Sequence, residues 1–217
     1  MMKTFTLSVF ILLLNFLSAN VSAQLTKGST WLGGSVGYSS DNSESQYNEK
    51  RKMHSFAFNP AIGKVVKQNL IVGIELNYLY YDDLQSGAKT HNYDYGGGVF
   101  VRKYIETFKK IYLFVHAGAG VSISHDKTDN TIDPDYETKG WRAMVTLYPG
   151  ISYALTSKIY LEAVFTNLFS MAYSNGKTTG TNNTEYKNSS FSAGASFDVA
   201  TNFGLGVRFV LPNKSNK

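Results

Sequence analysis

The chain has 217 residues, of which 43% are hydrophobic, 14% aromatic and 17% charged, and its formal net charge is +5. This charged fraction lies below the quarter that is usual for soluble globular proteins. Because the chain contains no cysteine, its composition excludes a disulfide scaffold, a thiolate metal site and a cysteine nucleophile.

Residues 1–23 have the three parts of a secretory signal peptide. Lys3 gives a positive start, residues 6–17 form an apolar centre, and Val21-Ser22-Ala23 is a small-residue cleavage site. The apolar run is about a dozen residues, which is shorter than the ~20 that a membrane-spanning helix needs. We therefore expect cleavage after Ala23 and one exported domain over residues 24–217.

The rest of the chain alternates between apolar and other residues with a period of two, and its alternating runs are rich in Tyr, Phe, Val, Ile and Thr. This pattern predicts β-strands. The predicted strands cover residues 29–39, 53–65, 70–81, 93–104, 111–124, 140–154, 159–170 and 191–210. Short connections alternate with four long polar ones at 40–52, 82–92, 125–139 and 171–190. The prediction is an all-β fold, an eight-stranded antiparallel up-and-down transmembrane β-barrel with long extracellular loops and short periplasmic turns.

One face of every predicted strand carries no charge, as in the alternating positions that contain Ile74, Val99 and Val121. All charges of the strand cores lie on the opposite face. A lysine or arginine at the bilayer midplane would cost ~2–4 kcal/mol. A charge-free face around all strands therefore predicts contact with lipid, and a soluble exported barrel is the structural alternative.

Aromatic residues gather near the strand ends, with Tyr78, Tyr95 and Trp141 toward the long loops and Tyr104 and Phe209 toward the short turns. They are candidates for the two interfacial girdles of a membrane barrel. The alternative is that strands are simply rich in aromatic residues. Asn167 is the exception to the apolar face, and a bulge or a position above the hydrocarbon would accommodate it.

The inner face carries charges that can pair across a narrow lumen. Eight strands enclose an interior that side chains can fill, which argues against a wide diffusion pore. Neighbouring strands suggest Glu75 with Arg102 and Glu162 with Arg208, because unpaired buried charges are costly. Arg142 and Asp198 lie nearer the loop end and are a candidate third pair there. The predicted structural lumen charges are Glu75, Arg102, His116, Arg142, Glu162, Asp198 and Arg208.

Several phrases carry a family resemblance, namely NPAIGKVVKQNLIVGIELNY, GGGVFVRKYIETFKKIYLFVHAGAG, YPGISYALTSKIYLEAVF and FGLGVRF. They resemble the small OmpX- and OmpA-like proteins of the outer membrane protein beta-barrel domain family that are common in Bacteroidetes, over residues 25–210. The resemblance implies an outer-membrane location and insertion by the barrel assembly machinery. The chain departs from many outer-membrane proteins in that Phe209 is followed by VLPNKSNK rather than ending the sequence.

These observations favour a non-enzymatic protein that contributes to envelope integrity or to surface interaction through its loops. Porin-like transport of small solutes or ions is the alternative, and a lipid A-modifying enzyme is the second alternative. An enzyme would need a paired nucleophile and base, yet strand alternation directs the neighbours His54 and Ser55, and likewise Ser124 and His125, to opposite faces.

The sequence predicts no cofactor, no metal site and no nucleic-acid partner. The expected partners are outer-membrane lipid and lipopolysaccharide, the barrel assembly machinery during biogenesis, and an unidentified extracellular ligand of the loops. The basic cluster Glu49-Lys50-Arg51-Lys52 is a candidate contact for lipopolysaccharide phosphates.

Overall fold

The computed structural model describes residues 25–44, 50–85, 88–129, 135–165, 168–180, 184–195 and 203–213. The predicted signal peptide, Asn167 and Asp198 lie outside these residues. Within the described part, no helix is long and apolar enough to cross a membrane. The strands are β1 (Thr30–Glu44), β2 (Lys50–Lys67), β3 (Leu70–Gln85), β4 (Ala88–Phe108), β5 (Ile111–Asp129), β6 (Tyr136–Ala154), β7 (Ile159–Phe165), β8 (Phe169–Gly180), β9 (Glu185–Ala195) and β10 (Phe203–Leu211).

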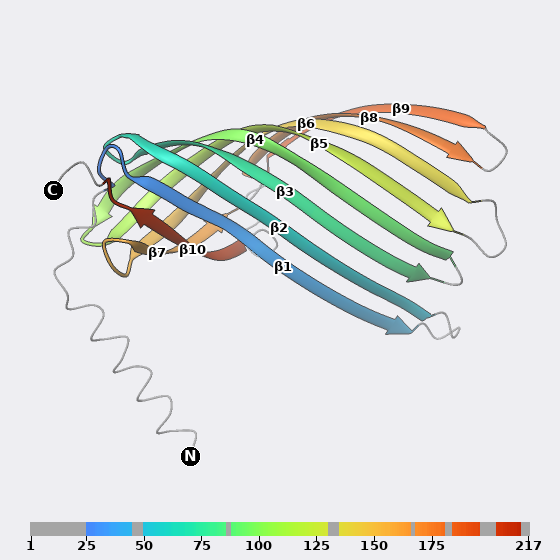
Figure 1. The fold of residues 1–217 in the computed structure, drawn as a ribbon, viewed down its shortest axis with the longest axis horizontal. Coiled ribbons are helices and arrows are strands. Elements are labelled where there is room, and N and C mark those ends of the chain that lie inside the picture. Colours follow the sequence, from blue (N-terminus) through green and yellow to red (C-terminus); the bar gives the residue numbers. More distant parts are fainter. Residues whose placement is uncertain are drawn as a thin grey trace, which may run out of the picture.

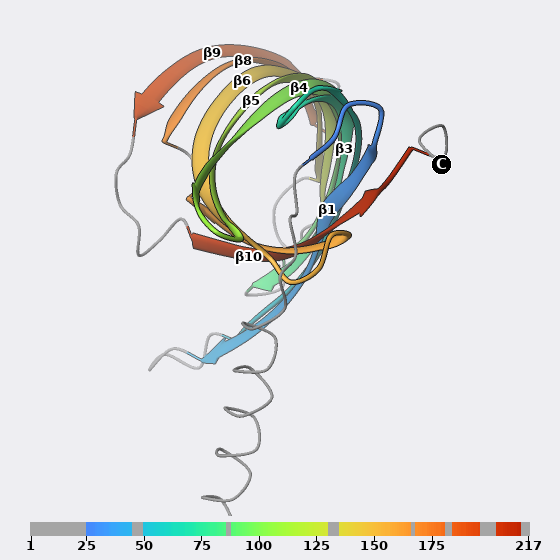
Figure 2. The same cartoon turned by 90° about the vertical axis from the view of Figure 1, so that its left-hand side faces the viewer.

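Eight of these strands close a barrel. Strands β1 to β6 pair in sequence order, β6 pairs with β7, β7 with β10, and β10 with β1, all antiparallel. Figure 2 shows this ring of strands from the end at which β10 meets β1. The two extra strands, β8 and β9, extend the sheet from β6 toward the far end of the molecule (Figure 1). The predicted eight-stranded antiparallel barrel is therefore confirmed.

The strands reach further toward the loop end than the apolar pattern indicates. Strand β4 begins at Ala88 and β5 ends at Asp129, so the predicted loops 82–92 and 125–139 are largely strand. Polar side chains on both faces remove the period-two signal there, while the strand pairing continues. Thr90 and Thr128, for example, face each other with hydroxyl oxygens 3.0 Å apart. The long connections expected from the sequence are thus to a large part paired polar strands.

The last two predicted strands are each divided. Residues 166–168 separate β7 from β8, whereas the longer segment 196–202 separates β9 from β10. The two hairpin registers therefore do not continue into each other, since Phe165 pairs with Phe203 but Phe169 pairs with Ala195. Among the described residues, β1 pairs with β10 only over Thr30–Leu32. Beyond that point the sheet spreads, and β1 and β9 lie on opposite sides of the loop end (Figure 1).

The opposite end is built from tight turns. Asn69 lies in the turn between β2 and β3, and Lys110 lies in the turn between β4 and β5. Their φ angles are 59° and 71°. Asparagine tolerates this left-handed region better than most residues. The segment before β1 lies against the first turn, where the carbonyl of Leu25 accepts a hydrogen bond from the Asn69 amide at 3.1 Å. Because the Leu25 residue is 1% exposed, this segment covers the turn end of the barrel.

The two faces of the barrel follow the predicted alternation. Outward residues such as Ile74, Val99 and Val121 are 54%, 59% and 60% exposed, as a lipid-facing surface requires. The apolar band on β5 runs from Leu113 to Ile123, in line with the ~9–11 residues that a tilted membrane strand needs. One girdle expectation was wrong. Tyr104 is 1% exposed and lies inside the barrel, because it alternates with outward residues of β4.

Candidate functional site

Three charged residues meet inside the barrel near the turn end. Arg102 comes from β4, Glu162 from β7 and Arg208 from β10. Glu162 Oε2 lies 2.8 Å from Arg102 Nη1 and 3.0 Å from Arg208 Nε. The side chains of Arg102 and Glu162 are 2% and 0% exposed. We call these three residues the arginine–glutamate cluster.

The cluster spans the lumen rather than a pair of neighbouring strands. Strands β5 and β6 separate β4 from β7 in the barrel wall, so the Arg102–Glu162 contact crosses the interior. Arg208 ties in a further strand, because its Nη1 donates to the carbonyl oxygen of Gly34 on β1 at 2.7 Å. Gly34 has a φ angle of 133°, a conformation that favours glycine. The cluster therefore connects four strands around the barrel.

Aromatic side chains surround the cluster. The Tyr104 hydroxyl donates to Glu162 Oε1 at 2.5 Å. The Arg102 Cζ lies 4.7 Å from the ring centre of Trp31 and 4.5 Å from that of Phe114, which is within the range of cation–π attraction. These contacts offset part of the excess positive charge of two arginines beside one glutamate. We call the cluster together with Trp31, Tyr104 and Phe114 the turn-end plug.

An apolar layer closes the barrel beyond the plug. Its buried members come from the N-terminal segment and from strands around the ring, and they are Leu25, Val65, Ile71, Tyr112, Ala154, Tyr160 and Val210. The rings of Tyr112 and Tyr160 lie 6.2 Å apart at their centres. The turn end of the lumen is thus filled by side chains.

His116 forms the loop-side boundary of the plug. Its Nδ1 lies 3.2 Å from both Nε and Nη2 of Arg102. Since arginine nitrogens can only donate, Nδ1 acts as the acceptor and the proton of the neutral imidazole lies on Nε2. That nitrogen faces Glu75 Oε2 at 3.7 Å. The imidazole also stacks against Phe100 and Tyr148, with ring centres 5.0 Å and 4.4 Å away.

The lumen above His116 contains a cavity of about 370 Å³. Glu75, Asn59 and Asn77 supply polar groups to its wall, which suit ordered water. Gly118 leaves space for Glu75, since a Cβ there would lie 3.0 Å from Glu75 Oε1. The cavity ends at the plug, because Arg102 and Arg208 also line it.

The structure thus brings five of the predicted lumen charges together, with partners that differ in part from the expected ones. Glu162 lies beside Arg208 as expected, but Arg102 pairs with Glu162, and Glu75 faces His116. Arg142 is exposed in the part of β6 nearer the loop end, and it forms no ion pair among the described residues. Its expected partner, Asp198, lies outside the described residues, so that pair stays a prediction.

The residues considered for catalysis do not converge. Ser124 lines the interior near Arg142, whereas His125 Nε2 lies 2.5 Å from Glu137 Oε1 on the outer face. His54 is exposed on β2. Among the described residues, no group of three or more His, Asp or Glu could hold a metal ion.

In the basic segment at the start of β2, Arg51 forms an ion pair with an acidic residue of the same chain. Arg51 Nη2 and Nε lie 2.7 Å and 3.0 Å from the two carboxylate oxygens of Asp83. This pair lies beyond the apolar band, toward the hairpin tips. The Arg51 guanidinium holds the pKa of the Asp83 carboxyl below its usual range.

The family model for the outer membrane protein beta-barrel domain matches residues 9–198. This chain belongs to that family. It is accordingly an outer-membrane β-barrel protein, as the resemblance implied. None of the curated proteins compared with the chain is significantly similar to it.

Two solved structures are similar in fold. One is a major outer membrane protein from Thermus thermophilus, with 9% sequence identity, a TM-score of 0.45, and coverage of 85% of this chain and 98% of that chain. The other is the translocator domain of the autotransporter NalP from Neisseria meningitidis, with 9% identity, a TM-score of 0.40, and coverage of 85% and 87%.

Proposed function

We propose that this protein is a non-enzymatic, non-conducting barrel that contributes to envelope integrity or to surface interaction. The observation that carries the proposal is the turn-end plug. Arg102 and Glu162 reach each other from opposite walls at 2.8 Å, and the apolar layer around Leu25 and Tyr160 lies beyond them. A hydrated ion crossing the barrel would have to displace this buried ion pair.

Breaking the plug is energetically costly, which supports a resting state without conduction. Separating a buried ion pair leaves charges without compensation, at ~3–5 kcal/mol. The Tyr104 hydroxyl and the aromatic rings around Arg102 add further contacts that would be lost. An open lumen would therefore be a rare state.

The surface role rests on the extracellular hairpins. Strands β1 to β6, β8 and β9 extend beyond the apolar band as polar hairpins, which supports contacts with molecules at the cell surface. Export through the signal peptide at residues 1–23 and insertion by the barrel assembly machinery are parts of the same proposal.

Planar-bilayer recording tests the proposal. The purified wild-type protein is expected to give no unitary conductance steps, at a protein density at which a known porin gives many. A variant with Arg102→Ala, Arg208→Ala, Tyr112→Ala and Tyr160→Ala removes both arginines of the plug and two large rings of the apolar layer beyond it, and it is expected to show steps. A gel mobility shift on boiling checks that each sample contains folded barrels. Stable conductance steps from the wild-type protein would refute the proposal and favour porin-like transport.

A further inference from the structure

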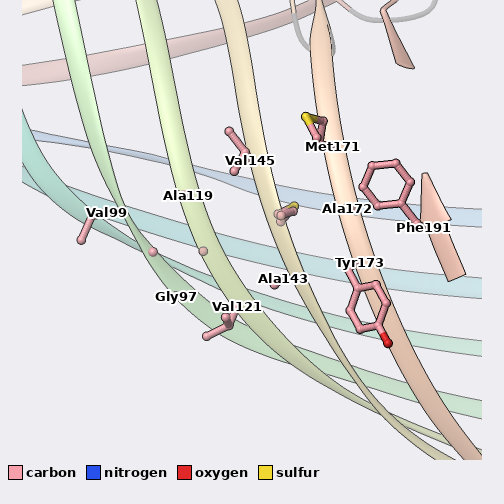
Figure 3. Close-up of a pocket in the computed structure, with 13 residues that line it drawn as sticks. Gly97, Val99, Ala119, Val121, Ala143, Val145, Met171, Ala172, Tyr173 and Phe191 are labelled. Atoms are coloured by element: carbon pink, nitrogen blue, oxygen red, sulfur yellow. The ribbon is translucent and has the colours of Figure 1, made fainter. Parts of the chain in front are cut away.

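The outer face of the barrel is hollowed where β4, β5, β6, β8 and β9 lie side by side. The hollow has a volume of about 560 Å³, and its floor includes Gly97, Ala119 and Ala143. Figure 3 shows the rings of Tyr173 and Phe191 beside it. We call this hollow the lipid-facing groove.

The groove arises from small residues placed between large ones. Ala119 pairs with Val99 on one side and Val145 on the other. Ala143 pairs with Val121 and Tyr173 in the neighbouring row. Each small residue is therefore a gap in a row of larger side chains, and the gaps in the two rows join.

The groove lies inside the hydrocarbon region. Trp141 lies two residues before Ala143 on the same outward face of β6, nearer the loop end, and its ring centre is 5.5 Å from that of Tyr173. Tryptophan and tyrosine mark the level of the lipid headgroups in membrane barrels. An apolar groove directly below that level faces acyl chains rather than water.

Three lysines line up above the groove. Lys139 on β6 pairs with Lys177 on β8, and Lys177 pairs with Lys187 on β9. Their Cα atoms are therefore in one row across strands that lie ~4.8 Å apart. Lys139 is four residues from Ala143 along β6, or about 13 Å at the ~3.3 Å rise of a strand. This lysine row lies just beyond the aromatic level, at the height of the headgroups.

The lysine row carries more positive charge than the neighbouring carboxylates balance. Lys139 Nζ lies 3.0 Å from Glu137 Oε1, and Lys177 Nζ lies 2.5 Å from Glu185 Oε1. Lys187 forms no ion pair with any other described residue. Three adjacent lysines thus share two carboxylates that are 41% and 50% exposed. Like charges directly opposite on paired strands repel each other, and a phosphate group offers more negative charge and more acceptor oxygens than a carboxylate.

We propose that the lipid-facing groove and the lysine row form one binding site for the lipid A end of lipopolysaccharide. An acyl chain would lie on Gly97, Ala119 and Ala143, and a phosphate would lie on the row of Lys177 and Lys187. The basic segment at residues 49–52 is less suited, because it lies at the start of β2, a strand that does not line the groove. The site rests on the outer-membrane location of the barrel and is independent of whether the lumen conducts.

Native mass spectrometry of the detergent-purified protein tests the site. Diphosphoryl lipid A, monophosphoryl lipid A and phosphatidylglycerol are titrated separately, and the bound fraction is measured. Charge-assisted contacts at an exposed site contribute less to binding than buried ones, but two lysines act together here. The double variant K177Q/K187Q is therefore expected to weaken diphosphoryl lipid A binding by about tenfold. A119F, which fills the groove, is expected to weaken it as well.

Matched variants separate the site from general effects of charge or bulk. K52Q/K89Q removes two lysines from β2 and β4, and A117F adds a ring on the same face of β5 but outside the groove lining. Both are expected to bind like the wild type. Equal binding by K177Q/K187Q and the wild type would overturn the proposal. So would equal binding of phosphatidylglycerol and lipid A, or a dimer that A119F abolishes, because the groove would then hold another lipid or a second copy of the chain.

Discussion

Replacement of Glu162 by glutamine tests the central contact of the plug. The wild-type carboxylate accepts a hydrogen bond from Tyr104 at 2.5 Å and lies 2.8 Å and 3.0 Å from nitrogens of Arg102 and Arg208. The variant leaves two buried guanidinium groups facing a neutral amide. Removing one partner of a buried ion pair costs ~3–5 kcal/mol, against a total stability of ~5–15 kcal/mol for a typical domain. We therefore expect E162Q to lose a large part of the free energy of unfolding.

Urea unfolding in lipid vesicles measures this loss, with the boiled and unboiled gel mobilities as a second readout. E75Q is the matched control, because Glu75 is 36% exposed and faces the cavity at 3.7 Å from His116. It is expected to change the unfolding free energy by less than ~1 kcal/mol. If E162Q and E75Q unfold at the same urea concentration as the wild type, the assignment of Glu162 to a buried structural pair is wrong.

Three further changes test the rest of the barrel. Ile74→Lys places a charge in the apolar band at an outward position that is 54% exposed, and it should cost ~2–4 kcal/mol; Leu84→Lys, on the same face beyond the band, should cost little in the same unfolding assay. Gly150→Ala places a Cβ 2.2 Å from the Cζ of the buried Phe114 ring. We therefore expect a lower melting temperature, from ~1–3 kcal/mol of overpacking. In carboxyl NMR, the Asp83 carboxyl should titrate below the ~3.9 of free aspartate. The Arg51–Asp83 pair therefore contributes stability above that pH and loses it as the pH falls through the folded-state pKa. Arg51→Gln should return the pKa of Asp83 to the ordinary range, and an unchanged pKa would show that the pair does not form in solution.

The apolar pattern predicted the membrane-spanning part of the barrel well, because one face of each strand must be apolar in lipid. The residues Ile74, Val99 and Val121 face outward for that reason. The pattern could not predict the strand extensions around Ala88 and Asp129, since strands in water need no apolar face. It also could not predict the division near Phe165, which depends on the registers of two separate hairpins.

The lumen charges were predictable as inward residues, whereas their partners were not. Strand neighbours suggested Glu75 for Arg102, but a narrow barrel lets Arg102 reach Glu162 across the interior. The roles of Trp31 and Tyr104 were missed for a similar reason. The alternation of Tyr104 with the outward residues of β4 was a usable signal that its ring lies inside the barrel. The cation–π contact of Trp31 and the hydrogen bond of Tyr104, however, depend on which strands face each other across the lumen.

The sequence contains two tryptophans, and their fluorescence tests the inside–outside assignment most directly. Trp31 is 2% exposed inside the plug, and Trp141 is 45% exposed on the outer face. In vesicles, a W31F variant, which retains Trp141, should be quenched by lipids brominated near the headgroup. A W141F variant, which retains Trp31, should be quenched neither by brominated lipid nor by iodide in the buffer. Strong quenching of Trp31 by iodide would contradict the sealed lumen, and quenching of Trp31 by brominated lipid would contradict the assignment of the two faces.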